Sequence, residues 1–265
     1  MAMLPSLRDL WREGGTALGG WLSVPTPVSA EIVARTGVDY VCIDAQHGAV
    51  EYSDAVAMIQ AILLGGSRPI VRVPWNEQGI IGKMLDAGAQ GVIVPMVNTV
   101  ADAEAVVRSC RYAPHGGARS WGPGLASPRV DGHYLDWAAD HVAVIPMIET
   151  TEALRNLEAI LAVDGIDAVY VGPADLSLTL GLMPQNNDGE APFDEALGRI
   201  VAACQAAGVV PGIHASGALT PARRAAGFRM ITVSTDSLAM RAGFLDELER
   251  ARSDSSDPAA GGDLY

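Results

Sequence analysis

Short apolar runs alternate along the chain with segments in which apolar residues recur every three or four positions. The runs are rich in β-branched residues and are typical of buried strands, whereas the spaced segments are typical of amphipathic helices. We predict strands at residues 17–22, 38–43, 69–73, 91–94, 142–148, 168–171, 209–213 and 230–233. We predict helices at residues 27–36, 53–64, 78–87, 101–110, 151–161, 193–207, 221–226 and 238–252.

This eightfold alternation of strand and helix predicts an α/β protein with the (β/α)8 fold of a TIM barrel, formed by residues 1–252 as one domain. A doubly wound open sheet is the alternative, but no Gly-x-Gly-x-x-Gly sequence follows a strand. The segment 111–140 is long for a connection and indicates a functional loop or an interface. Residues 253–265 are polar and rich in turn-forming residues, so we expect a disordered tail.

Composition and charge narrow the range of partners. The net charge is −13 and the isoelectric point is near 4.7, which argues against nucleic acid and against anionic membranes as partners. We find neither a secretory signal nor an 18-residue apolar segment, and we expect a cytoplasmic protein. Cys42, Cys110 and Cys204 lie far apart in apolar or helical segments, which predicts buried, reduced thiols.

Lysine is almost absent from the chain. Lys83 is the only one, and it lies within a predicted helix rather than at the end of a strand. A mechanism that uses a Schiff base would need this residue. We interpret Lys83 as a solvated or interface charge.

Two carboxylates come where predicted strands leave the core. Glu149 directly follows the fifth strand, and Asp175 comes shortly after the sixth. Because the carboxyl ends of parallel strands in a barrel meet at one rim, the two side chains are predicted to hold a divalent cation such as Mg²⁺ or Mn²⁺. Each taken alone is also consistent with a solvated loop acid.

Other polar groups follow the remaining strands at the same rim. Arg72 lies within the third strand, where its guanidinium is predicted either to contact a substrate oxygen or to form a buried ion pair with Asp44 or Glu149. His47, after the second strand, suits acid–base chemistry, although a loop histidine bonded to a carbonyl is the alternative. His214 follows the seventh strand.

Two glycine-containing segments complete the candidate site. The turn predicted at residues 172–175 could direct backbone N–H groups at an anion, or could be an ordinary loop. The segment 116–121 contains Arg119, which we predict either to contact an acidic substrate or to form an arginine–aromatic contact between subunits.

On these residues the chain resembles the HpcH/HpaI family, which comprises metal-dependent pyruvate aldolases of the 4-hydroxy-2-oxoheptanedioate and 2-dehydro-3-deoxyglucarate type. The most specific match is the Gly-Pro-Ala-Asp-Leu-Ser sequence at residues 172–177, with Ile-Glu-Thr upstream at residues 148–150. Further matches are residues 20–22, 39–48, 71–76, 85–89, 94–97 and 111–119, together with the single residues Val171 and Gly181.

The resemblance implies a class II aldolase, a carbon–carbon lyase that reversibly cleaves 4-hydroxy-2-oxo acids to pyruvate and an aldehyde through a metal-stabilised enolate. It implies Mg²⁺, Mn²⁺ or Co²⁺ at Glu149 and Asp175. It further implies a homohexamer in which the last helix is swapped between subunits, and a role in the catabolism of aromatic compounds.

The resemblance also implies individual residue roles. Arg72 is expected at the keto oxygen of pyruvate, and His47 is expected to move protons with support from Asp86 of a neighbouring subunit. The expected substrate-binding residues are Trp21, Gln46, Arg72, Ser120, Gly172, Pro173, Ala174, Asp175 and His214, with backbone amides near Ala174 and Asp175 holding the pyruvate carboxylate.

Two positions depart from the family pattern. Gln46 stands where the family commonly has Glu before the histidine, and His214 stands where relatives often carry an aliphatic residue. The alternatives are therefore a related lyase that decarboxylates oxaloacetate or cleaves a CoA thioester, and a non-catalytic oxo-acid binding protein on the same barrel.

Overall fold

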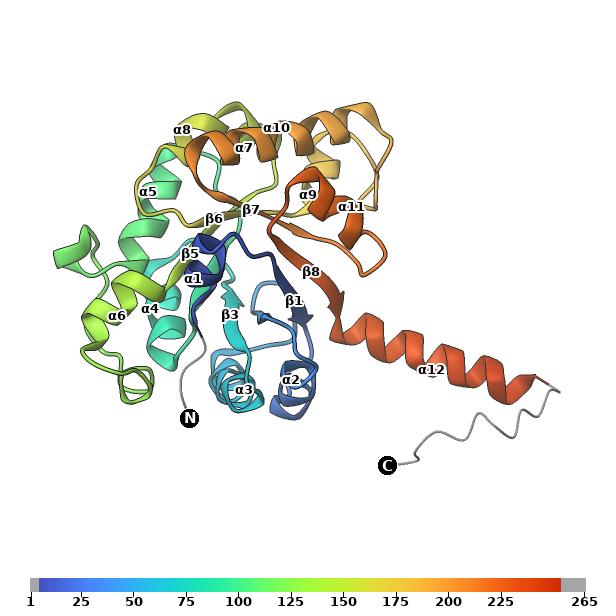
Figure 1. Cartoon of the computed structure of the whole chain (residues 1–265), viewed down its shortest axis with the longest axis horizontal. Coiled ribbons are helices and arrows are strands. Elements are labelled where there is room, and N and C mark those ends of the chain that lie inside the picture. Colours follow the sequence, from blue (N-terminus) through green and yellow to red (C-terminus); the bar gives the residue numbers. More distant parts are fainter. Residues whose placement is uncertain (1–4, 254–265) are drawn as a thin grey trace.

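The chain forms a closed barrel of eight parallel strands that follow one another in chain order (Figure 1). The computed structural model describes residues 5–253. The strands are β1 (Ala17–Leu22), β2 (Tyr40–Asp44), β3 (Arg68–Arg72), β4 (Gly91–Val94), β5 (Ala143–Ile148), β6 (Ala168–Val171), β7 (Val210–His214) and β8 (Met230–Thr235). Pairing of β1 with β8 closes the barrel, which confirms the predicted fold.

Helices cover the outside of the barrel between successive strands (Figure 1). The following helices begin at, or within two residues of, the predicted position: α2 (Pro27–Ala34), α3 (Tyr52–Gly65), α4 (Gln78–Ala87), α5 (Val100–Cys110), α10 (Ala191–Ala207), α11 (Thr220–Ala226) and α12 (Asp236–Arg252). The helix predicted at residues 151–161 is divided into α7 (Thr151–Arg155) and α8 (Leu157–Leu161). The break is at Asn156, whose side chain donates to the carbonyl of Asn98.

Three short helices were not predicted, namely α1 (Leu7–Arg12), α6 (Tyr134–His141) and α9 (Pro173–Thr179). The connection between β4 and β5 also contains two 3-10 turns, η1 (Ala113–His115) and η2 (Ser127–Arg129). The side chain of His133 caps α6, which is an unusual capping residue. Proline is the first residue of α9, so the predicted turn at residues 172–175 is a helix start.

The core has two layers, one inside the barrel and one between strands and helices. Inside, the hydroxyl groups of Tyr40 and Tyr170 both form hydrogen bonds with the hydroxyl group of Thr232. A Cβ atom on Gly19 would come within 2.2 Å of the Tyr40 ring, so this glycine is needed for packing. Leu7 and Trp11 of α1 extend the inner layer.

All three cysteines are buried free thiols, as predicted. Burial raises the pKa of the Cys110 and Cys204 thiols to about 12, and it raises the pKa of Cys42 as well. The three thiols are therefore protonated at neutral pH and are poor nucleophiles.

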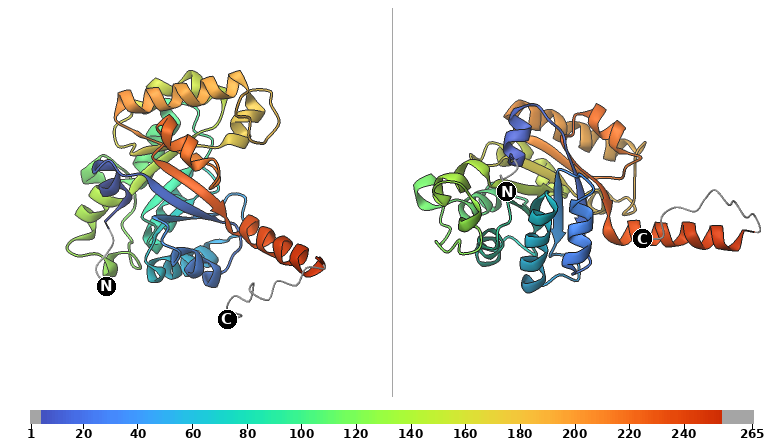
Figure 2. Two further views of the ribbon diagram at one scale, coloured as in Figure 1. Left: turned by 45° about the vertical axis from the view of Figure 1, so that its right-hand side comes forward. Right: turned by 60° about the horizontal axis from the view of Figure 1, so that its bottom comes forward.

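The last helix, α12, does not cover the barrel but projects away from it (Figures 1 and 2). Every residue from Ser237 to Ser253 is exposed, including Leu238, Phe244 and Leu248. The tail predicted to be disordered, residues 253–265, lies outside the described residues except for Ser253. No helix among residues 5–253 is long and apolar enough to cross a membrane.

Candidate active site

A pocket of about 510 Å³ opens at the carboxyl-terminal ends of the strands. Eight of the residues predicted to form the site line it: Trp21, His47, Arg72, Gly172, Pro173, Ala174, Asp175 and His214. These residues come from β1, from the ends of β3 and β7, from the loop after β2 and from the start of α9, and the closure of the barrel brings them together. The pocket is of the size that binds small molecules.

Arg72 and Asp44 form a buried ion pair at the base of this pocket. Arg72 Nε and Nη2 donate to the two carboxylate oxygens of Asp44, at 2.9 and 2.6 Å. The indole N–H of Trp21 donates to the same carboxylate, and the guanidinium lies 4.9 Å from the Trp21 ring centroid. Burial alone would raise the pKa of Asp44, but the hydrogen bonds and charge of Arg72 hold it below its ordinary value.

The ion pair that was the alternative interpretation of Arg72 therefore exists, but it does not use all the donors of the guanidinium. Within residues 5–253, Arg72 Nη1 has no hydrogen-bond acceptor, and Arg72 lines the pocket. Asp44 thus fixes the orientation of Arg72 and leaves N–H groups available to a ligand.

His47 is held by its backbone, and its exposed side chain lines the pocket. The N–H groups of Gln46 and His47 both donate to Asp44 Oδ1, at 3.1 Å. Gln46 itself does not line the pocket in the described chain, and its buried Oε1 atom has no partner there. One carboxylate therefore positions both the arginine and the histidine loop.

Glu149 is buried directly behind the pocket. It is only 2% exposed, and its Oε1 accepts a 2.8 Å hydrogen bond from the N–H of Met96. Met96 has a φ of 56°, a conformation that is unfavourable for a residue with a side chain. Burial and the negative charge of Asp175 raise the pKa of Glu149 to about 7, although the Met96 N–H and Arg72 oppose this.

Gly172, in the wall of the pocket, packs directly against the carboxylate of Glu149. A Cβ atom at this position would lie 2.5 Å from Glu149 Oε2, so any other residue would displace the carboxylate. Gly172 also precedes the first turn of α9, which carries Asp175. The local sequence thus brings the two acids to the same side of the pocket.

The two acids have the chemistry that a hard divalent cation requires. Among residues 5–253 no cluster of three or more His, Cys, Asp or Glu side chains is placed to hold a metal ion. The protein can nevertheless supply two carboxylates and leave other coordination positions to water and substrate. A cation would also neutralise the buried charge of Glu149 beside Asp175, so the residues present fit a metal.

His214 contributes a neutral imidazole to the pocket. Burial, together with the positive charge of Arg72, lowers its pKa to about 4. Its ring packs edge-on against Trp21, which in turn stacks on Tyr170. At neutral pH His214 can exchange hydrogen bonds with a ligand but carries no charge.

Like Gln46 and Glu149, the predicted residues Asp86 and Ser120 do not line the pocket in the described chain. Asp86 accepts a hydrogen bond from Arg119 Nη2 at 2.6 Å, and the Arg119 guanidinium lies over the rings of Tyr112 and Tyr134. Arg119 therefore makes an arginine–aromatic contact within its own chain, whereas the predicted alternative was such a contact between subunits. Ser120 is exposed on the neighbouring segment.

The sequence did not indicate the other residues of the pocket wall, which are Met147, Tyr170, Gln185, Asn186, Ala215, Ser216, Leu219 and Arg223. Met147 and Tyr170 could have been found from the alternation of inward positions along β5 and β6. Arg223, on α11, pairs at 2.5 Å with Asp188 in the loop before α10, and no local pattern predicts that contact.

Lys83 lies outside this pocket in the described residues. It is exposed on α4, and its Nζ lies 4.0 Å from the ring centroid of Tyr52. The position agrees with the interpretation of Lys83 as a surface charge and offers no amine for a Schiff base.

Comparison with known proteins identifies the family. The model of the family described as HpcH/HpaI aldolase/citrate lyase matches residues 18–242. A hydroxypyruvate/pyruvate aldolase of Rhizorhabdus wittichii is 42% identical over 231 residues, which cover 87% of this chain and 92% of the relative. A 4-hydroxy-2-oxo-heptane-1,7-dioate aldolase of Salmonella heidelberg is 38% identical over 217 residues, 80% of each chain.

Solved structures agree with the sequence comparison. A crystal structure of an HpcH/HpaI aldolase/citrate lyase family protein from Burkholderia cenocepacia J2315 superposes with a TM-score of 0.87 at 33% identity, covering 93% of this chain and 99% of that one. Together with the aldolase relatives, this places the protein among the carbon–carbon lyases of the aldehyde-lyase class. The chain belongs to the HpcH/HpaI aldolase/citrate lyase family.

Proposed function

We propose that this protein is a metal-dependent class II aldolase that interconverts 4-hydroxy-2-oxo acids with pyruvate and an aldehyde. The observation that carries the proposal is that Arg72 and Asp175 line a pocket, with Glu149 buried beside them, and that the pocket has no lysine amine in the described chain. An enolate in such a pocket requires an electron sink other than a Schiff base.

The proposed cation is Mg²⁺, Mn²⁺ or Co²⁺, held by Glu149 and Asp175. When bound, it would supply Lewis-acid polarisation of the pyruvate carbonyl. Gly172 leaves the space that Glu149 needs, and the Met96 N–H fixes one carboxylate oxygen. Below pH 7 Glu149 must lose a proton before it can act as a ligand, because its pKa is raised to about 7.

The chain positions pyruvate through backbone and side-chain donors. Pro173 is the first residue of α9 and has no N–H, so the amides of Ala174 and Asp175 are the donors of its first turn that can hold the pyruvate carboxylate. Arg72 then faces the keto oxygen, where negative charge develops as the carbon–carbon bond breaks. Because Asp44 orients Arg72 in advance, little reorganisation accompanies the reaction.

Proton transfer falls to His47 in this proposal. Its side chain lines the pocket and can exchange a proton with the methyl carbon of pyruvate and with the 4-oxygen of the product. Asp86 supports His47 only across a subunit boundary, since within its own chain it pairs with Arg119. Trp21, His214 and the side of the pocket near Arg223 are left for the aldehyde.

We further propose that the protein is a homo-oligomer, a hexamer by resemblance, in which α12 packs on a neighbouring subunit. The support is the projecting helix with Leu238, Phe244 and Leu248 between 45% and 72% exposed (Figure 2). Exposure of large apolar side chains along a helix is typical of an interaction surface. Light scattering of wild type and Phe244→Ser tests this: a smaller assembly is expected for the variant, and a monomeric wild type would contradict it. We also propose that the protein is cytoplasmic.

The experiment for the catalytic proposal is aldol addition of pyruvate to a panel of small aldehydes, monitored by mass spectrometry with Mn²⁺ and with excess chelator. We expect chelator-sensitive formation of 4-hydroxy-2-oxo acids. The double variant Glu149→Ala, Asp175→Ala is expected to be inactive. Full activity of that variant in the presence of chelator would show that the proposed mechanism is wrong.

A further inference from the structure

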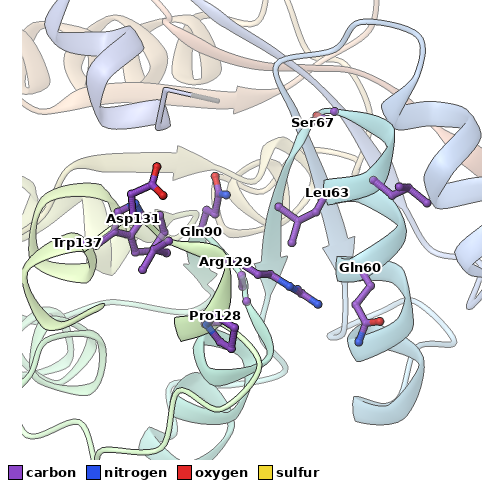
Figure 3. A pocket seen from close by; sticks show the side chains of 14 residues that line it. Gln60, Leu63, Ser67, Gln90, Pro128, Arg129, Asp131 and Trp137 are labelled. Carbon is purple, nitrogen blue, oxygen red and sulfur yellow. The ribbon is translucent and has the colours of Figure 1, made fainter. Parts of the chain in front are cut away.

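A second cavity, of about 520 Å³, lies at the opposite, amino-terminal end of the barrel (Figure 3). It is formed by the last turn of α3, the residues just before β3 and β4, the segment at residues 126–131 and α6. It is as large as the candidate active site and within the range of roughly 300–1,000 Å³ that is usual for small-molecule sites. The proposed aldolase chemistry makes no use of it.

A buried glutamine side chain without a partner points into this cavity. Gln90 immediately precedes β4 and is only 6% exposed, yet its Oε1 atom has no hydrogen-bond partner within the described chain. Both backbone groups of Gln90 are bonded, to Pro69 and Ala143. Side chains alternate along a strand, so Gln90 faces the same way as Val92, into the apolar layer between strands and helices.

A polar side chain at such a position is unfavourable unless it has a hydrogen-bond partner. Figure 3 shows Gln90 between Trp137 and Asp131 on one side and Leu63 and Ser67 on the other. The unpaired amide oxygen, which rotation of the side-chain amide would turn toward the cavity, therefore favours a ligand that carries a hydrogen-bond donor, such as a hydroxyl group.

A second side chain provides an unpaired positive charge. Arg129 lies across the cavity toward Gln60 (Figure 3), and no carboxylate in the described chain lies within ion-pair distance of it. Its Nη1 atom would be 3.2 Å from a Cβ atom on Gly88, so the absence of a side chain there leaves room for the guanidinium. The carboxylate of Asp131 is turned away from Arg129 (Figure 3).

The remaining wall is apolar and includes an aromatic ring. Leu63 and Leu64 line one side, Leu64 being 61% exposed, and Trp137 lines the other. An apolar body between these side chains would remove apolar surface from water. The cavity thus combines an anion-binding group, a hydrogen-bond acceptor and apolar walls.

We propose that this cavity is a second binding site, for a small organic acid that has an apolar body and a hydroxyl group. The carboxylate binds Arg129, the body packs between Leu63 and Trp137, and the hydroxyl donates to Gln90. The site is separate from the pocket of Arg72 and does not depend on the proposed aldolase activity.

The test is isothermal titration calorimetry of the full chain with 3-(4-hydroxyphenyl)propanoate. Arg129→Gln is expected to weaken binding by about tenfold or more, because a charge-assisted bond is lost. Gln90→Met, which keeps the shape but removes the amide, is expected to abolish the preference for this probe over 3-phenylpropanoate, which lacks the hydroxyl group. Arg155→Gln, at an exposed arginine outside the cavity, is the matched control and is expected to bind as wild type does.

Arg72→Lys separates this site from the candidate active site and is expected to leave binding unchanged. Thermal melts of all variants establish that they are folded. Any of the following results would overturn the proposal: no binding to wild type at about 10 mM probe, equal binding to Arg129→Gln, or loss of binding in Arg72→Lys. Equal affinity for the corresponding neutral amide would also contradict it.

Discussion

Two buried aspartate–arginine ion pairs lie at opposite ends of the barrel, and they differ in what surrounds the arginine. At the amino-terminal end Asp167 pairs with Arg8 and Arg111, at 2.7 and 3.0 Å. Arg111 also donates to the carbonyls of Ala138, Val142 and Gly165. At the carboxyl-terminal end Arg72 bonds only Asp44 in the described chain and faces the pocket.

The two aspartates also respond differently to burial. Burial raises the pKa of Asp167 even though two arginines oppose the effect, whereas Arg72 holds the pKa of Asp44 below its ordinary value. An aspartate–arginine ion pair is therefore structural where the protein satisfies the donors of the arginine, as at Asp167. It is functional where some donors are left to a ligand, as at Arg72. The predictions below test this distinction.

Arg111→Ala is expected to have the largest effect, on stability. It leaves Asp167 buried with one partner fewer and removes the bonds to three carbonyls, so the free energy of unfolding should fall by about 3–5 kcal/mol. Urea denaturation measures the change. Arg199→Ala, which breaks an exposed pair with Glu158, is the control and should cost about 0–1 kcal/mol. Equal losses in the two variants would show that the amino-terminal pair is not structural.

Arg72→Lys is expected to affect turnover more than folding. Lysine keeps the charge beside Asp44 but loses the planar fork that faces the pocket, so kcat should fall about 10²–10³-fold. Steady-state kinetics and a urea titration on the same preparation separate the two effects. A kcat equal to that of wild type, or a loss of activity fully explained by unfolding, would contradict the functional interpretation of Arg72.

Glu149→Gln is expected to weaken metal binding and to stabilise the metal-free protein. Folding raises the pKa of Glu149 from 4.5 to about 7, so the folded state binds more protons than the unfolded state between these values, and stability falls as pH rises through this range. Removing the charge should therefore stabilise the metal-free protein at pH 8 by on the order of 3 kcal/mol and should weaken Mn²⁺ binding. Thermal melts with and without Mn²⁺ measure both effects.

Glu158→Gln, at an exposed carboxylate, is the control for Glu149→Gln and should change neither property appreciably. Unchanged Mn²⁺ affinity in Glu149→Gln would remove Glu149 from the proposed metal site.

His214→Asn is expected to have the smallest effect, on acid stability. The pKa of His214 is lowered from 6.5 to about 4, so the unfolded state takes up the proton first as pH falls below 6.5. Wild type should lose on the order of 2 kcal/mol more stability than His214→Asn between pH 7 and pH 4, after allowance for partial exposure. His115→Asn, at an exposed histidine, is the control. Parallel pH profiles for wild type and His214→Asn would show that the imidazole is not held neutral.

The barrel could be predicted from the sequence because strand and helix periods differ and repeat eight times. The helices that were missed are short, and two have unusual start signals: His133 caps α6, and the proline of α9 suggested a turn. The third, α1, begins with an ordinary capping box at Ser6 but has only six residues. Helices of this length depend on tertiary contacts more than on their own sequence preferences.

The rim residues could be predicted because each lies at or shortly after the end of an apolar strand. The strained Met96 that bonds Glu149 and the pair of Arg223 with Asp188 could not, since both depend on where distant loops meet. Asp86 and Ser120 remain predictions, because one chain does not bring them to the pocket.

The most direct test of the account is proton NMR of the pyruvate methyl group in D₂O with the enzyme and Mg²⁺, and then with excess chelator. We expect metal-dependent loss of the methyl signal, which reports enolate formation without any assumption about the aldehyde, and we expect no loss in Glu149→Gln. Retention of the methyl signal by wild type with metal demonstrably bound would contradict the account and would favour a protein that binds oxo acids without turning them over.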